Sequence, residues 1–213
     1  MKIKQQKITK LNISFGNHKL GDNILIINMG TATDCPSAKL GLCNAINNGI
    51  KCYALKAEIQ YPNTVPNYRY KQFEYWRNNT ATKITNDIIE KIKSRNGSPV
   101  KYLRFNEAGD AWDINDFKKL NIIAKKLKNF NIITYGYTAR SDLILEVQKF
   151  KEIHFLVKGS GFTKEQAEGI NGMTTIISKD QEVPEGFILC PGSCKSCSFC
   201  MQNKKFNIAF RKH

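Results

Sequence analysis

Short apolar runs alternate along the chain with segments whose apolar residues recur at helical spacing. The apolar runs span residues 23–29, 100–105, 131–135, 152–157, 174–178 and 186–189. Runs rich in β-branched and aliphatic residues are typical of parallel strands that are covered on both faces. The pattern therefore predicts six strands in a buried parallel sheet.

Helix signals lie between the predicted strands. Asp113, Ser141 and Thr163 each precede apolar residues at helical spacing and are predicted N-caps, and a further apolar stripe follows Thr82. Strands that alternate with helices predict right-handed βαβ units and an α/β fold. Because six strands are too few for a closed eight-stranded barrel, we expect an incomplete (β/α)6 barrel-like parallel sheet, with a doubly wound sheet as the alternative.

The length is that of one domain. A chain of 213 residues can bury one sizeable core, and it contains no internal repeat, low-complexity tract or long linker. We therefore expect a single α/β metal-binding domain over residues 1–213, in which residues 190–213 form a cysteine-rich C-terminal tail.

Hydropathy and charge limit the cellular compartment and the class of partner that we expect. The sequence has no apolar run long enough to span a membrane, and its N-terminal segment lacks the apolar core of a secretory signal. We expect a cytoplasmic protein, of an oligomeric state that the sequence leaves open. The formal net charge is +15, which favours a polyanionic partner such as a nucleotide or nucleic acid. The alternative is a compositional bias toward Lys, Asn and Ile, because the lysines are scattered along the chain.

The seven cysteines fall into two groups, and none lies outside them. Their positions are Cys35, Cys43 and Cys52 in the first group and Cys190, Cys194, Cys197 and Cys200 in the second. Clustered cysteines in a reducing compartment predict metal or redox chemistry rather than disulfides. A shell made only of thiolates selects an iron–sulfur cluster or zinc. All seven cysteines are therefore candidate metal ligands.

The spacing in the second group favours iron–sulfur over zinc. Its four thiols lie within eleven residues, in a string similar to the ferredoxin run with the spacings reversed, whereas structural zinc sites use two separated pairs. We expect one or two 4Fe–4S clusters, with zinc as the alternative. The three thiols of the first group would leave one iron open for a substrate or S-adenosylmethionine. Alternatively Cys190 joins the first group, or the thiols of that group are core residues.

Polar side chains follow nearly every predicted strand, where α/β proteins place their binding and catalytic groups. Glu107 and Asp110, separated by a glycine hinge, are candidate catalytic carboxylates that could hold an amine, a ribose or a cation. Arg140 is the third candidate catalytic residue, because next to a helix N-terminus it could hold a carboxylate or phosphate. The candidate cofactor-binding residues are Asn106, Gly109, Thr138, Ser141, Lys158 and Ser160.

Each of these candidates also has a purely structural alternative. The carboxylates could cap the next helix, and Arg140 could simply face solvent beside a capping Ser141. Lys158 and Ser160 are expected in a small flexible loop before a helix, and such a loop need not bind phosphate.

Four stretches of the chain resemble the phage-encoded gene product 88 family and, more distantly, phage proteins with radical-SAM-like barrels. They are Cys35-Pro-Ser with Cys43, Cys52-Tyr-Ala and Tyr61-Pro62; Arg104-Phe-Asn-Glu-Ala-Gly-Asp110; Tyr137-Thr-Ala-Arg-Ser141; and the closing cysteine string with His213. The resemblance implies a phage or prophage origin, hence a host cytoplasm, and a metal-binding α/β fold. It implies no reaction, and the first cysteine group is far wider than the C-x3-C-x2-C loop of radical SAM enzymes.

Together these features favour an iron–sulfur enzyme of radical-SAM-like type that acts on a nucleotide or nucleic acid. The alternative is a non-catalytic, metal-stabilised nucleic-acid-binding protein, in which zinc or an iron–sulfur cluster only holds loops in place. The two functions differ in whether the protein converts a substrate.

Overall fold

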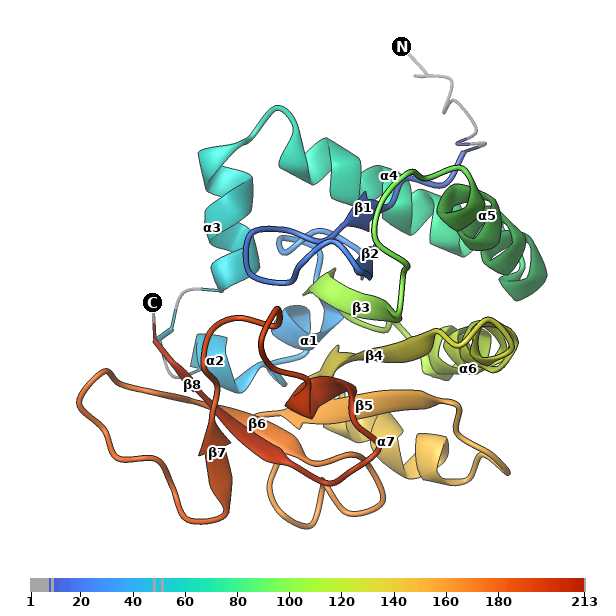
Figure 1. The fold of residues 1–213 in the computed structure, drawn as a ribbon. Helices are drawn as coiled ribbons and strands as arrows, with labels where there is room; N and C mark the ends of the chain where they lie inside the picture. The colour runs from blue at the N-terminus through green and yellow to red at the C-terminus, as the bar shows by residue number, and fades with distance from the viewer. Residues whose placement is uncertain (1–7, 9, 48, 51, 213) are drawn as a thin grey trace.

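The structure is a computed structural model and describes residues 8, 10–47, 49–50 and 52–212. Within these residues eight strands form one sheet in the order β1-β2-β3-β4-β5-β6-β8-β7 (Figure 1). The strands are β1 (Ser14–Phe15), β2 (Ile24–Met29), β3 (Tyr102–Gly109), β4 (Ile133–Thr138), β5 (Phe155–Ser160), β6 (Met173–Ile177), β7 (Phe187–Leu189) and β8 (Asn207–Arg211). β1 pairs antiparallel with β2, and the other neighbours pair in parallel. The predicted α/β fold with a parallel sheet is confirmed.

The sheet is open rather than closed into a barrel. Strands β2 to β6 lie side by side in sequence order, as in a barrel wall, and β1 and β7 are the two free edges. A doubly wound sheet needs a reversal of strand order, and β2 to β6 show none. Right-handed crossovers between sequential strands place every connecting helix on the same face. One face of such a sheet is therefore left for something other than helices to cover.

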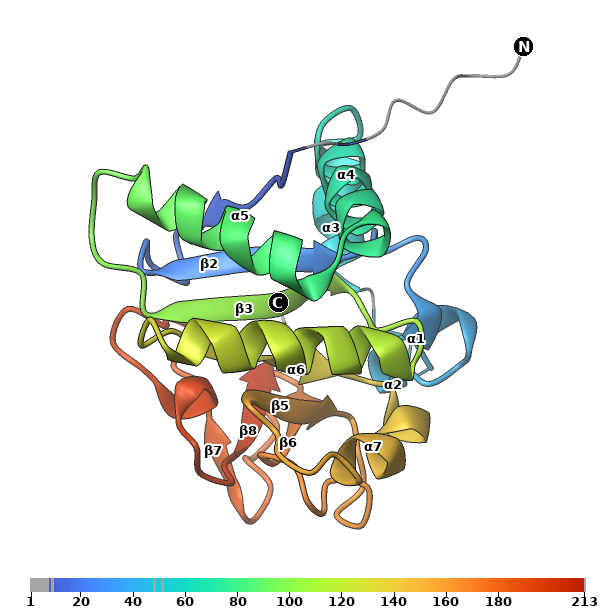
Figure 2. The same cartoon turned by 90° about the vertical axis from the view of Figure 1, so that its right-hand side faces the viewer.

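The longer helices cover one face. The helical elements are α1 (Pro36–Lys39), α2 (Asn44–Asn47), α3 (Tyr53–Gln60), α4 (Val65–Asn78), α5 (Ala81–Lys93), α6 (Ile114–Lys128), α7 (Ser141–Gln148) and the short 3-10 helix η1 (Phe199–Met201). Helix α4 packs on β2 and α6 packs on β4 and β5, while α5 and α7 flank α6 (Figure 2). Helices α1 to α3 instead lie between β2 and α4 in the chain, beyond the carboxyl end of β2.

The main core lies between this helical layer and the sheet. Leu25, Ile27 and Phe105 of the strands are almost fully buried against Phe117 and other apolar residues of the helices. The rings of Phe117 and Phe155 stack with centroids 6.0 Å apart. Each fully buried side chain of this size contributes about 1.5–3 kcal/mol, so this layer carries most of the apolar stabilisation.

Several predicted boundaries are wrong because pairing in the sheet extends the strands. Met29 of β2 pairs with Gly109, so β3 continues through Asn106, Glu107 and Gly109, which were expected in a loop. A register shift between Ile27 and Met29 accommodates Asn106, whose φ is 58°. The expected flexible loop at Lys158 and Ser160 is likewise part of β5, because these residues pair with β4 and β6.

The predicted helix starts have mixed outcomes. Asp113 is the N-cap of α6, and its carboxylate accepts a hydrogen bond from the Asn115 N–H at 2.8 Å. Ser141 does not cap α7, because the chain already becomes helical there and Arg140 occupies the cap position. Thr163 precedes a series of turns rather than a helix. Gly169 takes a φ of +82° in that segment, which an α-helix does not accommodate.

The segment predicted as a cysteine-rich C-terminal tail, residues 190–213, contains the strand β8. β8 lies between β6 and β7 and runs parallel to both. The chain that leaves β7 at Cys190 must therefore return along the sheet before β8 can begin. We call this return segment, residues 190–206, the cysteine string. Its 3-10 helix lies against β4 and β5 (Figure 1).

The cysteine string covers the face of the sheet that the long helices leave open. Ile24, Ile26 and Tyr135 alternate with the helix-side residues of their strands, and they pack with Leu20 and with Met201 of the string. We call this side the cysteine face. The other strand residues that point to it are Tyr102, Arg104, Tyr137, Leu156 and Lys158. The second cysteine group was expected beyond the carboxyl ends of the strands. Its Cys194 and Cys200 instead pack against a face of the sheet.

Candidate functional site

The first cysteine group lies at the start of three successive helices beyond the carboxyl end of β2. Cys35 is the N-cap of α1, Cys43 directly precedes α2, and Cys52 is the N-cap of α3. Cys43 is within electrostatic range of Cys35 and Cys52, and Asp110 acts on both Cys35 and Cys43. The structure therefore brings these thiols, distant in sequence, together beside one carboxylate. We call Cys35, Cys43, Cys52 and Asp110 the edge site.

Two thiols of the edge site, those of Cys35 and Cys43, hold their protons at neutral pH. Burial raises the pKa of Cys35 to about 11, with a smaller contribution from the charge of Asp110. The backbone N–H groups of Ala38 and Ser37 act in the opposite direction. Burial also raises the pKa of Cys43. A metal that binds as a thiolate complex must displace these protons, so its affinity will rise with pH.

Asp110 connects the segments that follow three neighbouring strands. Its carboxylate is buried and accepts five hydrogen bonds: from the Ser37 hydroxyl (2.7 Å), the Thr138 hydroxyl (2.7 Å), the Asn106 amide (3.1 Å) and the N–H groups of Ala111 (2.8 Å) and Ala139 (2.8 Å). Burial raises its pKa, and the hydrogen bonds oppose that rise. These donors occupy the lone pairs of the carboxylate. The geometry therefore favours a positioning role over proton transfer.

Glu107 takes no part in this network. Its Oε1 accepts a hydrogen bond from the Asn17 amide at 3.0 Å, and its carbonyl accepts one from the Tyr53 hydroxyl. Glu107 and Asp110 therefore have separate partners. Gly109, between them, has a φ of +74°, and a Cβ there would lie 2.7 Å from the Gly30 nitrogen. The close approach of β2 and β3 accounts for this glycine.

Arg140 is held by groups of the protein itself. Its Nε and Nη2 donate to the two carboxylate oxygens of Asp142 at 2.8 and 2.7 Å, and its Nη1 donates to the carbonyls of Ala111 and Trp112. These four hydrogen bonds leave about one of the five N–H donors of the guanidinium for a ligand. Its own N–H donates to the Thr138 hydroxyl at 3.0 Å. Arg140 and Thr138 thus brace the end of β4 beside the edge site.

The second cysteine group gathers on the cysteine face. Cys194 and Cys200 act electrostatically on each other, and Cys190 and Cys197 act on both. Burial is the main cause that raises the pKa of Cys194 to about 11. Burial also raises the pKa of Cys200, although a hydrogen bond with the Tyr137 hydroxyl opposes it. The Gly192 N–H donates to Cys190 Sγ at 3.4 Å.

Cationic and phenolic groups lie beneath these thiols. Lys158 is 1% exposed, and its Nζ donates to the carbonyls of Asn171 (2.5 Å) and Phe206 (2.8 Å). Burial lowers its pKa, and Cys200 opposes this. The guanidinium of Arg104 lies 5.3 Å from the centroid of the Tyr137 ring. Within the described residues, Arg104 Nε and the Tyr135 hydroxyl are buried without a hydrogen-bond partner. We call the four cysteines of the string with Arg104 and Lys158 the face site.

Neither group forms a closed ligand shell. No three His, Cys, Asp or Glu side chains within the described part of the chain are arranged to hold a metal ion. All seven cysteines are described and free. His213, which the sequence placed near the string, lies outside the described residues. Binding of a metal therefore requires the thiols to turn inward.

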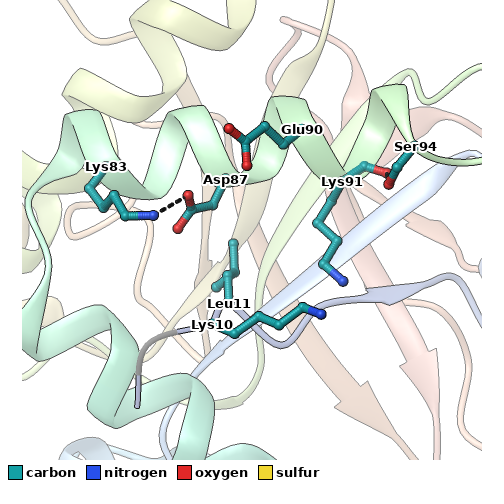
Figure 3. Close-up of a pocket in the computed structure, with 7 residues that line it drawn as sticks. All are labelled: Lys10, Leu11, Lys83, Asp87, Glu90, Lys91 and Ser94. Atoms are coloured by element: carbon teal, nitrogen blue, oxygen red, sulfur yellow. Dashed lines mark hydrogen bonds and ion pairs between the residues drawn. The ribbon is translucent and has the colours of Figure 1, made fainter. Parts of the chain in front are cut away.

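Two surface pockets lie away from both sites. One pocket, between residues 10–11 and α5, is lined by Lys10, Lys83, Asp87, Lys91 and neighbouring residues (Figure 3). Its Asp87 carboxylate accepts hydrogen bonds from Lys83 and Tyr75. A second pocket lies between α6 and residues 150–154. Neither pocket is lined by a cysteine, and both are lined by lysines.

The sequence indicated no role for Arg104, Tyr135 and Tyr137, although Arg104 and Tyr137 belong to stretches that resemble the family. Each lies in a strand that was interpreted as a continuous apolar run. The signal was the alternation of Tyr102 with Arg104 and of Tyr135 with Tyr137, because residues two apart share a face. This alternation places polar side chains on the face of the sheet that the cysteine string covers.

The fold and the cysteines define an open, mostly parallel α/β protein with free thiols gathered at one edge and on one face of its sheet. The chain belongs to the Gene product 88 family, whose model matches residues 2–154. The match includes all three cysteines of the edge site and ends before β5, so the cysteine string lies outside the matched part. No curated protein and no solved structure matches the chain. None of the helices in the described residues is long and apolar enough to cross a membrane.

Proposed function

We propose that the protein is an iron–sulfur enzyme of radical-SAM-like type, in which Cys35, Cys43 and Cys52 hold a 4Fe–4S cluster at the edge site. The observation that carries the proposal is the convergence of three helix-start thiols beyond the carboxyl end of β2, beside Asp110. Function gathers at this end of the strands in parallel α/β sheets. A cluster bound by three thiolates supplies one iron with a free coordination position.

The donor set fits such a group. Thiolates alone suit iron–sulfur clusters, and amide N–H groups at helix starts offset their negative charge. A buried polar atom also lacks a partner here: Asn106 Oδ1 accepts no hydrogen bond within the described residues. The Asn106 backbone has a φ of 58°, a conformation that costs about 1–2 kcal/mol in a residue with a Cβ. We assign Asn106 Oδ1 the role of accepting a hydrogen bond from the amine or hydroxyl of a bound ligand.

Three of the candidate residues, Asp110, Thr138 and Arg140, position this site. Asp110 fixes the α1 start through Ser37 and the β4 end through Thr138. Arg140 and Asp142 brace the next loop. A net charge of +15 supports a nucleotide or nucleic acid as the substrate class. S-adenosylmethionine is the cofactor that we propose for the open iron.

The test uses protein purified and reconstituted without oxygen. We expect about four iron and four sulfide per edge site, a change in the electron paramagnetic resonance spectrum on addition of S-adenosylmethionine, and 5′-deoxyadenosine after reduction. Serine at Cys35, Cys43 or Cys52 should abolish the spectral change. A cluster-loaded protein whose spectrum is unmoved by S-adenosylmethionine and that yields no cleavage product would refute the radical-SAM-like part.

A second candidate is a non-catalytic nucleic-acid-binding protein that a zinc or iron–sulfur centre stabilises. The lysines that line both surface pockets, on α5 and α6, favour it. Such binding should weaken linearly in log K with log salt, with a slope of roughly −0.9 per phosphate contacted on duplex DNA. Strong salt-dependent binding by a chain that converts no cofactor would favour this candidate over the enzyme.

A further inference from the structure

We infer that Cys190, Cys194, Cys197 and Cys200 form a second metal centre, separate from the edge site, whose net negative charge is balanced by the half-buried cation of Arg104 and the buried cation of Lys158. The inference extends the proposed function but does not require the edge site to hold a cluster. It also decides where Cys190 belongs, because the sequence alone allowed it to join the first group.

The backbone holds the four thiols on one patch of the cysteine face. Cys190 is tied to β8 through its N–H, which donates to the Ala209 carbonyl at 2.9 Å. Cys194 is tied to the loop before β2 by a 2.9 Å bond from its N–H to the Lys19 carbonyl. Cys200 lies in η1 against β4 and β5. Cys190 and Cys197 act electrostatically on both other thiols, so all four belong to one group.

The buried ammonium of Lys158 lies beneath the thiols with no anion among its hydrogen-bond partners. A buried ammonium is costly unless a negative charge or a metal complex compensates it. Lys158 contacts only two backbone carbonyls among its hydrogen-bond partners in the described residues, and no carboxylate pairs with it. Arg104 is half-buried and forms no salt bridge there, although the charge of Glu107 acts on it; its Nη2 donates to the Tyr53 hydroxyl at 3.4 Å, and its Nε has no hydrogen-bond partner. Of the thiols, Cys194 acts electrostatically on Arg104 and Cys200 acts on Lys158.

A metal bound by four thiolates supplies that missing charge. Four thiolates around a divalent ion, or around a doubly charged cubane, leave a net charge of about −2. Arg104 on β3 and Lys158 on β5 provide two positive charges on either side of β4. Neutral thiols leave Lys158 without a compensating negative charge, whereas thiolates bound to a metal supply one beside both cations.

The phenols of β4 complete the arrangement. Tyr135 is 1% exposed and its hydroxyl has no partner within the described residues. The Tyr137 hydroxyl already forms a hydrogen bond with Cys200. Both can donate to thiolate sulfur, and hydrogen bonds to sulfur are among the factors that set the potential of such centres. The cysteine face therefore contains the charge and the donors that a metal–thiolate centre needs around it.

The first experiment assigns the ligands by metal analysis of the full chain, purified without oxygen. Iron, sulfide and zinc are measured in the wild type, in an edge variant (Cys35→Ser, Cys43→Ser, Cys52→Ser) and in a face variant (Cys194→Ser, Cys197→Ser, Cys200→Ser). We expect the edge variant to keep the complete metal centre of the face site and the face variant to lose that centre. Zinc in that centre identifies a zinc site, and iron with sulfide identifies a cluster; both support the inference.

The possible results separate this inference from the proposed function. If the edge variant matches the wild type while the face variant is metal-free, the edge cluster is absent and the face centre stands. If the face variant keeps the full metal content, or if the edge variant loses all metal, a separate face centre is refuted. A wild-type chain without iron or zinc refutes both.

The second experiment tests the two cations as positioning residues. Lys158→Met and Arg104→Gln should each increase the rate of metal loss to a chelator, by about tenfold, as changes around a ligand shell do. In a cluster, loss of either charge should also shift the reduction potential to more negative values. Arg95→Gln is the matched control, since Arg95 already pairs with Asp22, and it should change neither quantity.

The stability of the chelator-treated chain separates this role from a structural one. Because Lys158 is buried without an anion, Lys158→Met should leave that chain as stable as the wild type or more stable, while it weakens metal binding. Arg104→Lys keeps the charge and should retain more metal than Arg104→Gln. Equal metal retention by Lys158→Met, Arg104→Gln and the wild type would overturn the charge-balance argument.

Discussion

The hydroxyl of Ser37 donates a 2.7 Å hydrogen bond to Oδ2 of Asp110, which is 73 positions away in the sequence. This bond connects the helix that begins after Cys35 to the ends of β3 and β4. The position of the first cysteine therefore depends on a carboxylate that is itself buried. Asp110 sets the shape of the edge site whether or not a ligand contacts it.

Replacement of Asp110 by Asn should destabilise the fold and disturb the edge site. An amide nitrogen would face N–H or O–H donors that now bind a carboxylate oxygen, and we expect a loss of about 2–4 kcal/mol in the free energy of unfolding. Urea unfolding followed by circular dichroism measures it. Asp180→Asn is the control, because Asp180 is exposed, and it should change stability little. A variant as stable as the wild type would show that the five hydrogen bonds contribute no net stability.

Local signals predicted some of this architecture and missed the rest for identifiable reasons. The cap at Asp113 was predictable, because its bond to the Asn115 N–H spans two residues. The role of Asp110 was not, because its partners come from the segments after three different strands. Ser37 in particular carries no sequence signal that points to position 110.

The cysteine face shows the same limit more strongly. A lysine directly after an apolar run suggests a surface loop, and Lys158 was interpreted in that way. Its burial depends on the cysteine string, which crosses β5 because β8 inserts between β6 and β7. The sequence shows neither the insertion nor the return path. The cysteine spacing revealed the thiols, but only the sheet order shows that they lie on Arg104 and Lys158.

The ion pair between Glu58 and Arg69 should be a strong determinant of the loop that precedes Cys35. The Arg69 Nη1 and Glu58 Oε1 atoms are 2.7 Å apart, and the two side chains are 6% and 4% exposed. Glu58 also accepts a 2.7 Å bond from the Ala32 N–H. Glu58→Gln leaves a buried cation uncompensated and should cost about 3–5 kcal/mol.

A double-mutant cycle isolates this pair from simple loss of packing. Glu58→Leu and Arg69→Met are measured singly and together by equilibrium unfolding. We expect the double variant to lose less stability than the sum of the two single variants, because it removes both charges at once. Strict additivity would mean that the two side chains do not stabilise each other.

A steric prediction concerns Gly109, which has a matched control at Gly41. Both have positive φ, +74° and +68°, but a Cβ at Gly109 would lie within 3 Å of the Gly30 backbone, whereas a Cβ at Gly41 meets nothing within 4 Å. Gly41→Ala should therefore cost about 1–2 kcal/mol for the backbone conformation alone. Gly109→Ala should cost a further 1–3 kcal/mol or so for the overlap. Equal losses in thermal unfolding would show that β2 and β3 separate without strain.

The fork between Arg140 and Asp142 predicts a pH dependence whose sign is fixed by the carboxylate. The hydrogen bonds from Arg140 are the first cause that lowers the pKa of Asp142. A carboxylate with a lowered pKa in the folded state adds stability above its unfolded pKa of about 3.9, and that stability is lost as the pH falls through the folded value. The difference in melting temperature between the wild type and Asp142→Asn should therefore be full near neutral pH and shrink below about pH 4. Asp180→Asn, whose carboxylate is exposed, should show no such trend. A difference that stays constant from neutral to acidic pH would mean that the two variants differ in packing and not in the charge of Asp142.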